Sequence, residues 1–484
     1  MAVSKADGAH VDVLIVGAGI SGVDAAYRLK TRSPSRSWLI LEARRQVGGT
    51  WDLFRFPGVR SDSDMYTLSF PFRPWRSDQA IVDGASIRRY VEETARDCGI
   101  AEHIRFGRKV VRAEWSSADK CWTVEADHDG KPERFTCAFL YFASGYYDYA
   151  QGYRPRWPGE ESFEGRIVHP QFWPGDLDYA GKSIVVIGSG ATAVTLVPPL
   201  AEKAAHVTMV QRSPSYIVAK PAKDAIAGGL LRLLPGALAD PLIRWKNLLL
   251  TMLIFSRARS RPEKFSQWVS DQLRKELPAG YPVERDFRPP YKPWDQRLCL
   301  VPDGDLFAAM RSGKASIATG RIERFTPAGL RLDSGEEIRA DIIVTATGLN
   351  MQMLGGVELS LDGEPVRTSE KLIYKGMMLS DVPNLFIAFG YVNASWTLRS
   401  DLTARSVCRL LNQMDRARVS VCIARARADI EPRPVMELTS SYVKRAESML
   451  PKQGDREPWR VPQNYARDFI GMTFGRIDEA LELT

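Results

Sequence analysis

Two strand–glycine turn–helix patterns and one apolar, helix-forming stretch predict an α/β fold, with two interleaved Rossmann-like dinucleotide-binding domains and a helical insertion. The two patterns begin near residues 11 and 183, and the apolar stretch falls within residues 221–294. The chain has 484 residues, which allows about three domains at roughly 150 residues each. Hydrophobic residues make up 44% and charged residues 26%, a composition typical of globular proteins.

The first pattern starts with the β-branched run Val11–Val16 and continues through Gly17, Gly19 and Gly22 into a helical segment. In a dinucleotide-binding turn the first glycine permits the tight turn, and the second lets the backbone approach a pyrophosphate. The third lets the helix pack on the strand, and the helix N-terminus offers free N–H groups to the phosphates. The next predicted strand ends on Glu42, whose carboxylate is suited to accept hydrogen bonds from ribose hydroxyls.

The second pattern repeats this arrangement with one chemical difference. A strand at Ser183–Ile187 leads into Gly188, Gly190 and Ala193, and the following strand is succeeded by Arg212 rather than by a carboxylate. A guanidinium suits the 2′-phosphate of NADP, so the two units predict two different dinucleotides. The alternative for Arg212 is an unpaired surface charge at the end of a strand.

Further small-residue segments complete the pattern of a flavoprotein that binds FAD in the first domain and NADPH in the second. Gly49, Thr50 and Trp51 follow the Glu42 strand, where small residues let the backbone pass close to a bulky ring. Residues 341–348 form a predicted buried strand that closes on Gly348, and we assign it to the resumed first domain. We therefore expect the FAD-binding domain at 1–149, the NADPH-binding domain at 150–220, the helical insertion at 221–294, the rest of the NADPH-binding domain at 295–340, and the rest of the FAD-binding domain with the C-terminal region at 341–484.

The helical insertion contains the apolar run Leu248–Phe255, followed closely by Arg257, Arg261 and Lys264. The run covers about 12 Å as a helix, far below the roughly 30 Å of a bilayer core, so it is not expected to span a membrane. One hypothesis places residues 248–264 peripherally on an anionic membrane. The alternative is a helix that faces the protein core, with solvated arginines beyond its end.

Charge and composition exclude several other classes. The net charge is +8 with the arginines spread along the chain, so no nucleic-acid partner is expected. The five histidines are scattered and the six cysteines form no CxxC motif, so we expect no metal site and no disulfide framework. Reduced cysteines and a polar N-terminus favour a cytoplasmic protein.

Phe163, Gly165, His169 and Trp173 lie within a segment of the form F-x-G-x-x-x-H-x-x-x-W-P. This is the fingerprint of type I Baeyer-Villiger monooxygenases, and the chain resembles these class B flavoprotein monooxygenases over nearly its whole length. The segments 52–64 and 293–299 are particularly similar to the ethionamide-activating branch.

The resemblance implies an enzyme that uses FAD, NADPH and O2 to convert ketones into esters or lactones through a flavin peroxide, with sulfoxidation as a possible side activity. It assigns the catalytic cation to Arg297 and its carboxylate partner to Asp62. It places His169 at the link between the domains, where we expect it to position and couple them rather than act as a base. Many members have a lysine where this chain has Gln296, so the choice of NADPH is expected to depend more on Arg212.

Two alternatives remain at the level of sequence. An oxygenase of nitrogen or sulfur atoms would have the same fold and cofactors, and only its substrate would differ from a ketone. A non-catalytic flavoprotein apposed to a membrane is supported only by the apolar and basic segment 248–264. No redox-active cysteine pair is present, which disfavours a disulfide reductase of the same architecture.

Overall fold

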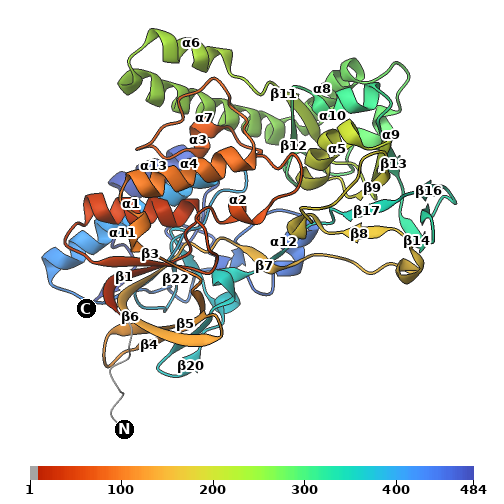
Figure 1. Cartoon of the computed structure of the whole chain (residues 1–484). Helices are drawn as coiled ribbons and strands as arrows, with labels where there is room; N and C mark the ends of the chain where they lie inside the picture. Colours follow the sequence, from red (N-terminus) through yellow and green to blue (C-terminus); the bar gives the residue numbers. More distant parts are fainter. Residues whose placement is uncertain (1–8) are drawn as a thin grey trace.

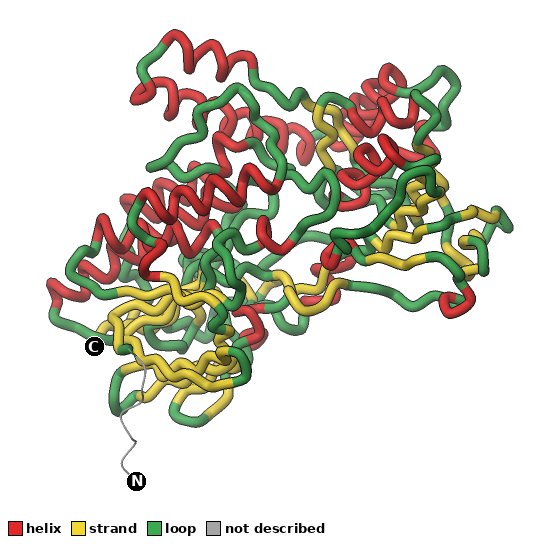
Figure 2. The backbone as a smooth tube through the Cα atoms, in the orientation of Figure 1, coloured by secondary structure: helices red, strands yellow, loops and turns green. Residues whose placement is uncertain are grey.

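The computed structural model describes residues 9–484, which form two sheet-based units below a layer of helices (Figures 1 and 2). The first sheet has the strand order β20-β19-β4-β5-β6-β1-β2-β3, and β23 also pairs with β6. Its strands are β1 (His10–Val16), β2 (Trp38–Glu42), β3 (Ile104–Phe106), β4 (Lys109–Ser116), β5 (Cys121–His128), β6 (Lys131–Phe142), β19 (Glu358–Leu361), β20 (Glu364–Pro365) and β23 (Leu385–Ile387).

The parallel part of this sheet forms where the sequence is richest in β-branched and other apolar residues. β1 runs parallel to β2 on one side and to β6 on the other, with Val13 opposite Trp38 and Phe139. All five residues of β2 are buried, as expected for a parallel strand covered on both faces. The helix α1 (Ile20–Arg32) follows β1 directly, so the predicted strand–turn–helix order of the first unit is present.

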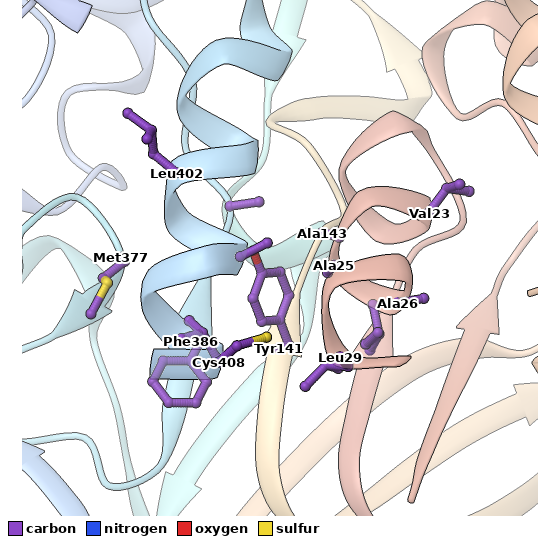
Figure 3. Close-up of a cluster of buried hydrophobic side chains, with 14 of the residues drawn as sticks. Val23, Ala25, Ala26, Leu29, Tyr141, Ala143, Met377, Phe386, Leu402 and Cys408 are labelled. Carbon is purple, nitrogen blue, oxygen red and sulfur yellow. The ribbon is translucent and has the colours of Figure 1, made fainter. Parts of the chain in front are cut away.

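Two helices distant in sequence pack together on the first sheet. α1 lies beside α11 (Trp396–Ala417), and Tyr141 of β6 lies between the two helices (Figure 3). Arg28 of α1 also forms a buried ion pair of 2.5 Å with Asp401 of α11. The C-terminal part of the chain therefore completes the core of the unit that the N-terminus begins.

The second sheet is entirely parallel and has the order β13-β10-β9-β17-β8. Its strands are β8 (Arg166–Val168), β9 (Ser183–Ile187), β10 (His206–Gln211), β13 (Ala315–Thr319) and β17 (Ile342–Thr345). The helices α5 (Ala191–Lys203) and α10 (Asp305–Arg311) pack against each other and against this sheet. The two units are thus separate sheets rather than one continuous sheet.

One strand lies in a different unit from the one we expected. We assigned residues 341–348 to the resumed first domain, but β17 pairs with β9 and β8 of the second sheet. The assignment of this strand is therefore wrong, because the pattern of a buried apolar strand that ends at a small turn fits either parallel sheet. The first unit resumes only after β17.

The chain crosses between the units twice, and the two crossings lie side by side. β7 (Tyr147–Gly152) leaves the first unit and β18 (Leu349–Met351) returns to it. These strands pair antiparallel, with Leu349 opposite Gly152 and Met351 opposite Tyr147. The units are therefore interleaved, as the sequence predicts.

The predicted insertion is helical, with α6 (Ala225–Leu233), α7 (Gly236–Ser260), α8 (Pro262–Glu276) and α9 (Val283–Phe287). The apolar run that we identified at 248–255 belongs to the longer helix α7. Figure 1 shows α6 and α7 at the top of the molecule, away from the first sheet. Within residues 9–484, no helix combines the length and apolar character needed to cross a membrane.

The remaining elements are further helices and small groups of strands. The helices are α2 (Thr50–Leu53), α3 (Met65–Leu68), α4 (Gly84–Asp97), α12 (Ser441–Ala446) and α13 (Tyr465–Phe474). The strand pairs and the small three-stranded sheet are β11 (Ile217–Lys220) with β12 (Cys299–Pro302), β14 (Ile322–Thr326) with β15 (Gly329–Leu332) and β16 (Glu337–Arg339), β21 (Ile373–Tyr374) with β22 (Met378–Leu379), β24 (Cys422–Ala424) with β27 (Leu481–Leu483), and β25 (Arg433–Pro434) with β26 (Lys452–Gln453).

Candidate active site and cofactor cleft

The first glycine turn connects β1 to α1 with little space to spare. Gly17 has a φ of +104°, and a side chain there would place its Cβ 2.8 Å from the carbonyl oxygen of Ala143. A Cβ on Gly22 would lie 1.9 Å from the carbonyl oxygen of Gly17, so the helix packs directly on the turn. Gly19 precedes α1 and provides no side-chain cap, which leaves N–H groups of the first helical turn available to a phosphate.

Glu42 is held at the end of β2 by backbone donors. The amide of Ala18 donates to one carboxylate oxygen at 2.6 Å, and the amide of Arg44 donates to the other at 2.8 Å. Burial raises the pKa of Glu42, and these two hydrogen bonds oppose that shift. Each carboxylate oxygen can accept more than one hydrogen bond, so the group keeps capacity for ribose hydroxyls beside the glycine turn.

The second glycine turn has the same construction. Gly188 has a φ of +138°, and a Cβ there would lie 2.4 Å from the carbonyl oxygen of Ala346. Gly190 precedes α5 without a side-chain cap, and a Cβ on it would meet no atom within 4 Å, so open space lies against this backbone. Arg212 follows β10, is exposed, and forms no ion pair of 4.0 Å or less with any residue in 9–484.

A single cleft of about 1350 Å³ joins the two turns. Pockets that hold one small ligand commonly measure about 300–1,000 Å³, so this cleft has room for more than one. Most of the expected cofactor residues line it, namely Gly17, Gly19, Glu42, Gly49, Thr50, Trp51, Asp62, Gly188, Gly190, Arg212 and Gly348. Gly22 and Ala193 do not line it; they lie in the contacts between strand and helix.

The segment after the first turn narrows this cleft. The backbones of Gly49 and Gly19 approach closely, because a Cβ on Gly49 would lie 3.1 Å from the Gly19 Cα. The hydroxyls of Thr50 and Tyr149 are 3.4 Å apart. The residues of both glycine turns therefore fit two dinucleotides. The backbone is bare where each pyrophosphate would lie, and the side chains near the two strand ends have opposite charges, Glu42 in the first unit and Arg212 in the second.

Arg297 reaches the cleft between the two units and is half-buried there. Its guanidinium donates a hydrogen bond of 3.0 Å to the hydroxyl of Tyr146. The phenol of Tyr146 is also the main group that raises the pKa of Arg297 above its usual range, while burial opposes this shift. Arg297 is therefore a permanent cation in the shared cleft.

Asp62 lines the same cleft but does not contact Arg297 as we expected. No ion pair of 4.0 Å or less joins the two within the described residues, and the guanidinium instead meets Tyr146. Burial raises the pKa of Asp62, and the charges of Arg297 and Arg60 oppose that shift. The structure therefore brings Asp62 and Arg297 to the same cleft without a direct ion pair between them.

The sequence analysis did not identify the aromatic residues around Arg297. Tyr146 packs at 5.1 Å against Trp396, and its hydroxyl lies 3.3 Å from that of Tyr147. Burial raises the pKa of Tyr442, and the charge of Arg297 opposes that shift. All four aromatic residues line the cleft. The only sequence signal was the position of Tyr146 and Tyr147 directly after the Ala-Ser-Gly turn that closes β6.

The fingerprint residues lie outside the cleft lining. The imidazole of His169 packs directly against the backbone of Gly152 in β7. A side chain at position 152 would place its Cβ 2.1 Å from the imidazole Cε1, so only glycine leaves room for the ring. Its Nδ1 accepts a hydrogen bond of 3.2 Å from the amide of Gln171, and burial lowers its pKa. His169 therefore packs on the strand pair that links the two units.

The other fingerprint residues also pack within the second unit. Phe163 packs edge-on against Phe325 at 6.2 Å, and a Cβ on Gly165 would lie 2.3 Å from the carbonyl oxygen of Asp341. Trp173 is partly buried and lies edge-on to Tyr179 at 6.4 Å. The structure therefore gives the fingerprint positions packing contacts and no direct contact with the cleft.

Comparison with known proteins assigns the chain to a family. A family model described as "Flavin-binding monooxygenase-like" matches residues 61–231, and one described as "NAD(P)-binding Rossmann-like domain" matches residues 15–78. The FAD-containing monooxygenase EthA of Mycobacterium tuberculosis is 54% identical over 472 residues, covering 97% of this chain and 96% of that protein. The chain belongs to the FAD-containing monooxygenase family. The EthA of Mycolicibacterium smegmatis is 49% identical, again over 97% of this chain and 96% of the relative.

Solved structures share the fold of this monooxygenase. An oxidized steroid monooxygenase bound to NADP has a TM-score of 0.75 at 19% identity and covers 98% of this chain and 99% of its own. The polycyclic ketone monooxygenase of Thermothelomyces thermophila has a TM-score of 0.77 at 17% identity and covers 100% of this chain and 91% of its own. Family membership makes the chain an enzyme, so the alternative of a non-catalytic flavoprotein is set aside.

Proposed function

We propose that this enzyme uses FAD, NADPH and O2 to convert ketones into esters or lactones. The observation that carries the proposal is the position of Arg297, a permanent cation in the one cleft that both dinucleotide turns share. One neighbour with the same fold is named a polycyclic ketone monooxygenase, which is compatible with a ketone substrate. The cofactors are FAD at the first turn and NADPH at the second.

Each glycine turn binds one of the two dinucleotides through its own set of residues. Gly17 and Gly19 leave bare backbone and helix N–H groups for the FAD pyrophosphate, and Glu42 accepts hydrogen bonds from its ribose. At the second turn Gly188 and Gly190 would do the same for NADPH, and the guanidinium of Arg212 would bind its 2′-phosphate. Opposite charges at the two strand ends direct each dinucleotide to its own turn.

When it is bound and reduced by NADPH, FAD supplies the activated oxygen that is inserted beside the carbonyl. Arg297 stabilises the negative charge that develops in the cleft, because a guanidinium stays protonated at any working pH. Tyr146 orients that guanidinium through its hydrogen bond, and Asp62 adds a compensating charge nearby. His169 packs on Gly152 at the link between the two units and does not line the cleft, so we assign it to positioning the units rather than to proton transfer.

The proposal is tested by purifying the protein with its flavin and assaying a mixed panel of ketones and sulfides with NADPH. We expect oxygen-dependent consumption of NADPH that is matched by esters or lactones identified by mass. Arg297→Ala should retain bound FAD and lose product formation, with Arg297→Lys as the charge-preserving control. Products consisting only of sulfoxides or N-oxides would contradict ketone oxygenation and assign the enzyme to heteroatom oxygenation.

The expected compartment is the cytoplasm. All six cysteines are free thiols, and four of them are buried. Burial raises the pKa of Cys422 to about 12, which keeps this thiol protonated and unreactive. A reducing compartment suits such a set of thiols, and it also provides NADPH.

A further inference from the structure

The helices α6 and α7 leave a continuous set of large apolar side chains in contact with solvent. We call this set the α6–α7 face, and it comprises Leu233 of α6 with Leu238, Leu242, Leu249, Leu253 and Ile254 of α7. Leu233 is 82% exposed, and the five residues of α7 are between 40% and 56% exposed. Single exposed leucines are ordinary in globular proteins, but a contiguous group of this kind marks a contact surface.

The spacing of four of these residues places them on one side of α7. Leu238, Leu242, Leu249 and Leu253 recur at intervals that keep them on one side of a helix of 3.6 residues per turn. On other sides of α7, Ala239, Ile243, Asn247 and Leu248 are buried against the rest of the molecule. The sequence-based alternative of a core-facing helix is therefore right for one side of α7 and wrong for the other.

Basic side chains follow the apolar residues at the C-terminal end of α7. Arg257 in the last turn of α7 and Arg261 directly after its end are both exposed. Neither forms an ion pair of 4.0 Å or less within residues 9–484. Residues 223–264 contain eight basic and three acidic side chains. Three of the basic residues are paired, Lys223 with Asp78, Lys246 with Asp224 and Arg259 with Asp295, and the acid Asp240 is paired with Arg76.

We propose that the α6–α7 face binds peripherally to an anionic lipid surface, with its leucines in the interface and Arg257 and Arg261 against the headgroups. A helix with one apolar side and a basic end lies in the plane of such an interface. The basic excess complements anionic headgroups, whereas a second copy of the same face would offer no opposite charge. Leu238, Leu242, Leu249 and Leu253 reach the interface together because they share one side of α7.

The test is co-sedimentation of the full-length flavoprotein with two kinds of vesicle. One is made of phosphatidylcholine alone, and the other of equal parts phosphatidylcholine and phosphatidylglycerol. We expect binding to the anionic vesicles that weakens as salt is added. Because the readout is binding, it does not depend on whether the enzyme oxygenates ketones, sulfides or amines.

Two double variants separate the apolar and the electrostatic contributions. Leu249→Gln with Leu253→Gln should weaken vesicle binding by about 30-fold, since about 1 kcal/mol is lost for each half-exposed leucine. Arg257→Gln with Arg261→Gln should weaken it similarly, at about 1 kcal/mol for each basic residue at an anionic surface. Leu249→Met with Leu253→Met is the matched control, because it keeps apolar side chains at both positions and should bind like the unchanged protein.

The proposal is overturned if the unchanged protein stays in the supernatant with anionic vesicles at low salt. It is also overturned if both vesicle types bind equally and the arginine variant binds like the unchanged protein. A third contrary result would be a lipid-free dimer that the Leu249→Gln, Leu253→Gln variant converts to a monomer, with no vesicle binding. That outcome would make the face a contact between copies. Circular dichroism of each variant confirms that α7 is retained.

Discussion

Replacing Arg212 by glutamine is the sharpest test of how the second turn selects its dinucleotide. Arg212 follows β10, lines the cleft and has no carboxylate within 4.0 Å among residues 9–484. Its charge is therefore free to meet the 2′-phosphate, which NADPH carries and NADH lacks. We expect the substitution to raise the KM for NADPH and to leave the KM for NADH unchanged.

The size of the effect follows from the exposure of Arg212. A hydrogen bond to a charged group contributes about 1.5–3 kcal/mol. Because Arg212 is exposed, water and salt screen the contact, and the lower end of that range applies. About 1.5 kcal/mol corresponds to a rise of about tenfold in the KM for NADPH.

The assay measures initial rates of NADPH and NADH oxidation at two salt concentrations, with a saturating concentration of the organic substrate that is oxygenated. The KM of the unchanged enzyme for NADPH should rise with salt more steeply than that of the variant. Arg324→Gln is the matched control, since Arg324 is exposed in the same unit but does not line the cleft. Equal changes in KM for both dinucleotides, or no change in either, would refute the role of Arg212.

Four further results are expected. Gln296→Lys should lower the KM for NADPH about threefold to tenfold, because it adds a cation to the cleft lining; an unchanged KM in steady-state assays would argue against this position. His169→Ala should lower the fraction of NADPH oxidation that yields product, or the retention of FAD, and the loss of one ionisation near neutral pH with intact coupling would contradict this. Tyr146→Phe removes the hydrogen bond to Arg297 and should reduce kcat about tenfold without changing the KM for NADPH; a change confined to that KM would instead indicate cofactor binding. Burial raises the pKa of Asp24 well above its unfolded value near 4. As pH rises above that unfolded value, the unfolded chain loses the proton of Asp24 while the folded chain keeps it, so the free energy of unfolding falls. Asp24→Asn should therefore gain stability relative to the unchanged chain as pH rises above about 4 in urea titrations, and a gain that shrinks with rising pH would refute the sign.

The glycine turns were predictable because their requirements are local. Gly17, Gly22 and Gly188 fill positions where a Cβ would strike the carbonyl of a neighbouring segment, and their spacing within each turn is visible in a few residues. Glu42 and Arg212 were also identified locally, since each sits at or just after a strand end that the apolar pattern defines. The assignment of FAD to the first unit and NADPH to the second depends mainly on these glycines, Glu42 and Arg212.

Features that depend on pairing across long stretches of sequence were not predictable. β17 was assigned to the wrong sheet, because its apolar residues fit either parallel sheet and only the contacts with β8 and β9 decide between them. The hydrogen bond between Tyr146 and Arg297 joins residues 151 positions apart, and no motif marks the tyrosine. The exposed side of α7 was equally hidden, because an apolar run has the same composition whether it faces the core or solvent.

The paired crossing strands have a consequence for how such a chain can be divided. Leu349 of β18 lies opposite Gly152 of β7, so residues 153–348 leave the first unit and re-enter it at almost the same point. Antiparallel partners have Cα atoms about 5 Å apart, a gap that a very short linker can close. The second unit is therefore joined to the first through one two-stranded junction, and exchanging it between related enzymes requires matching that junction, the contact of His169 with Gly152, and the packing of α7 on α3 of the first unit.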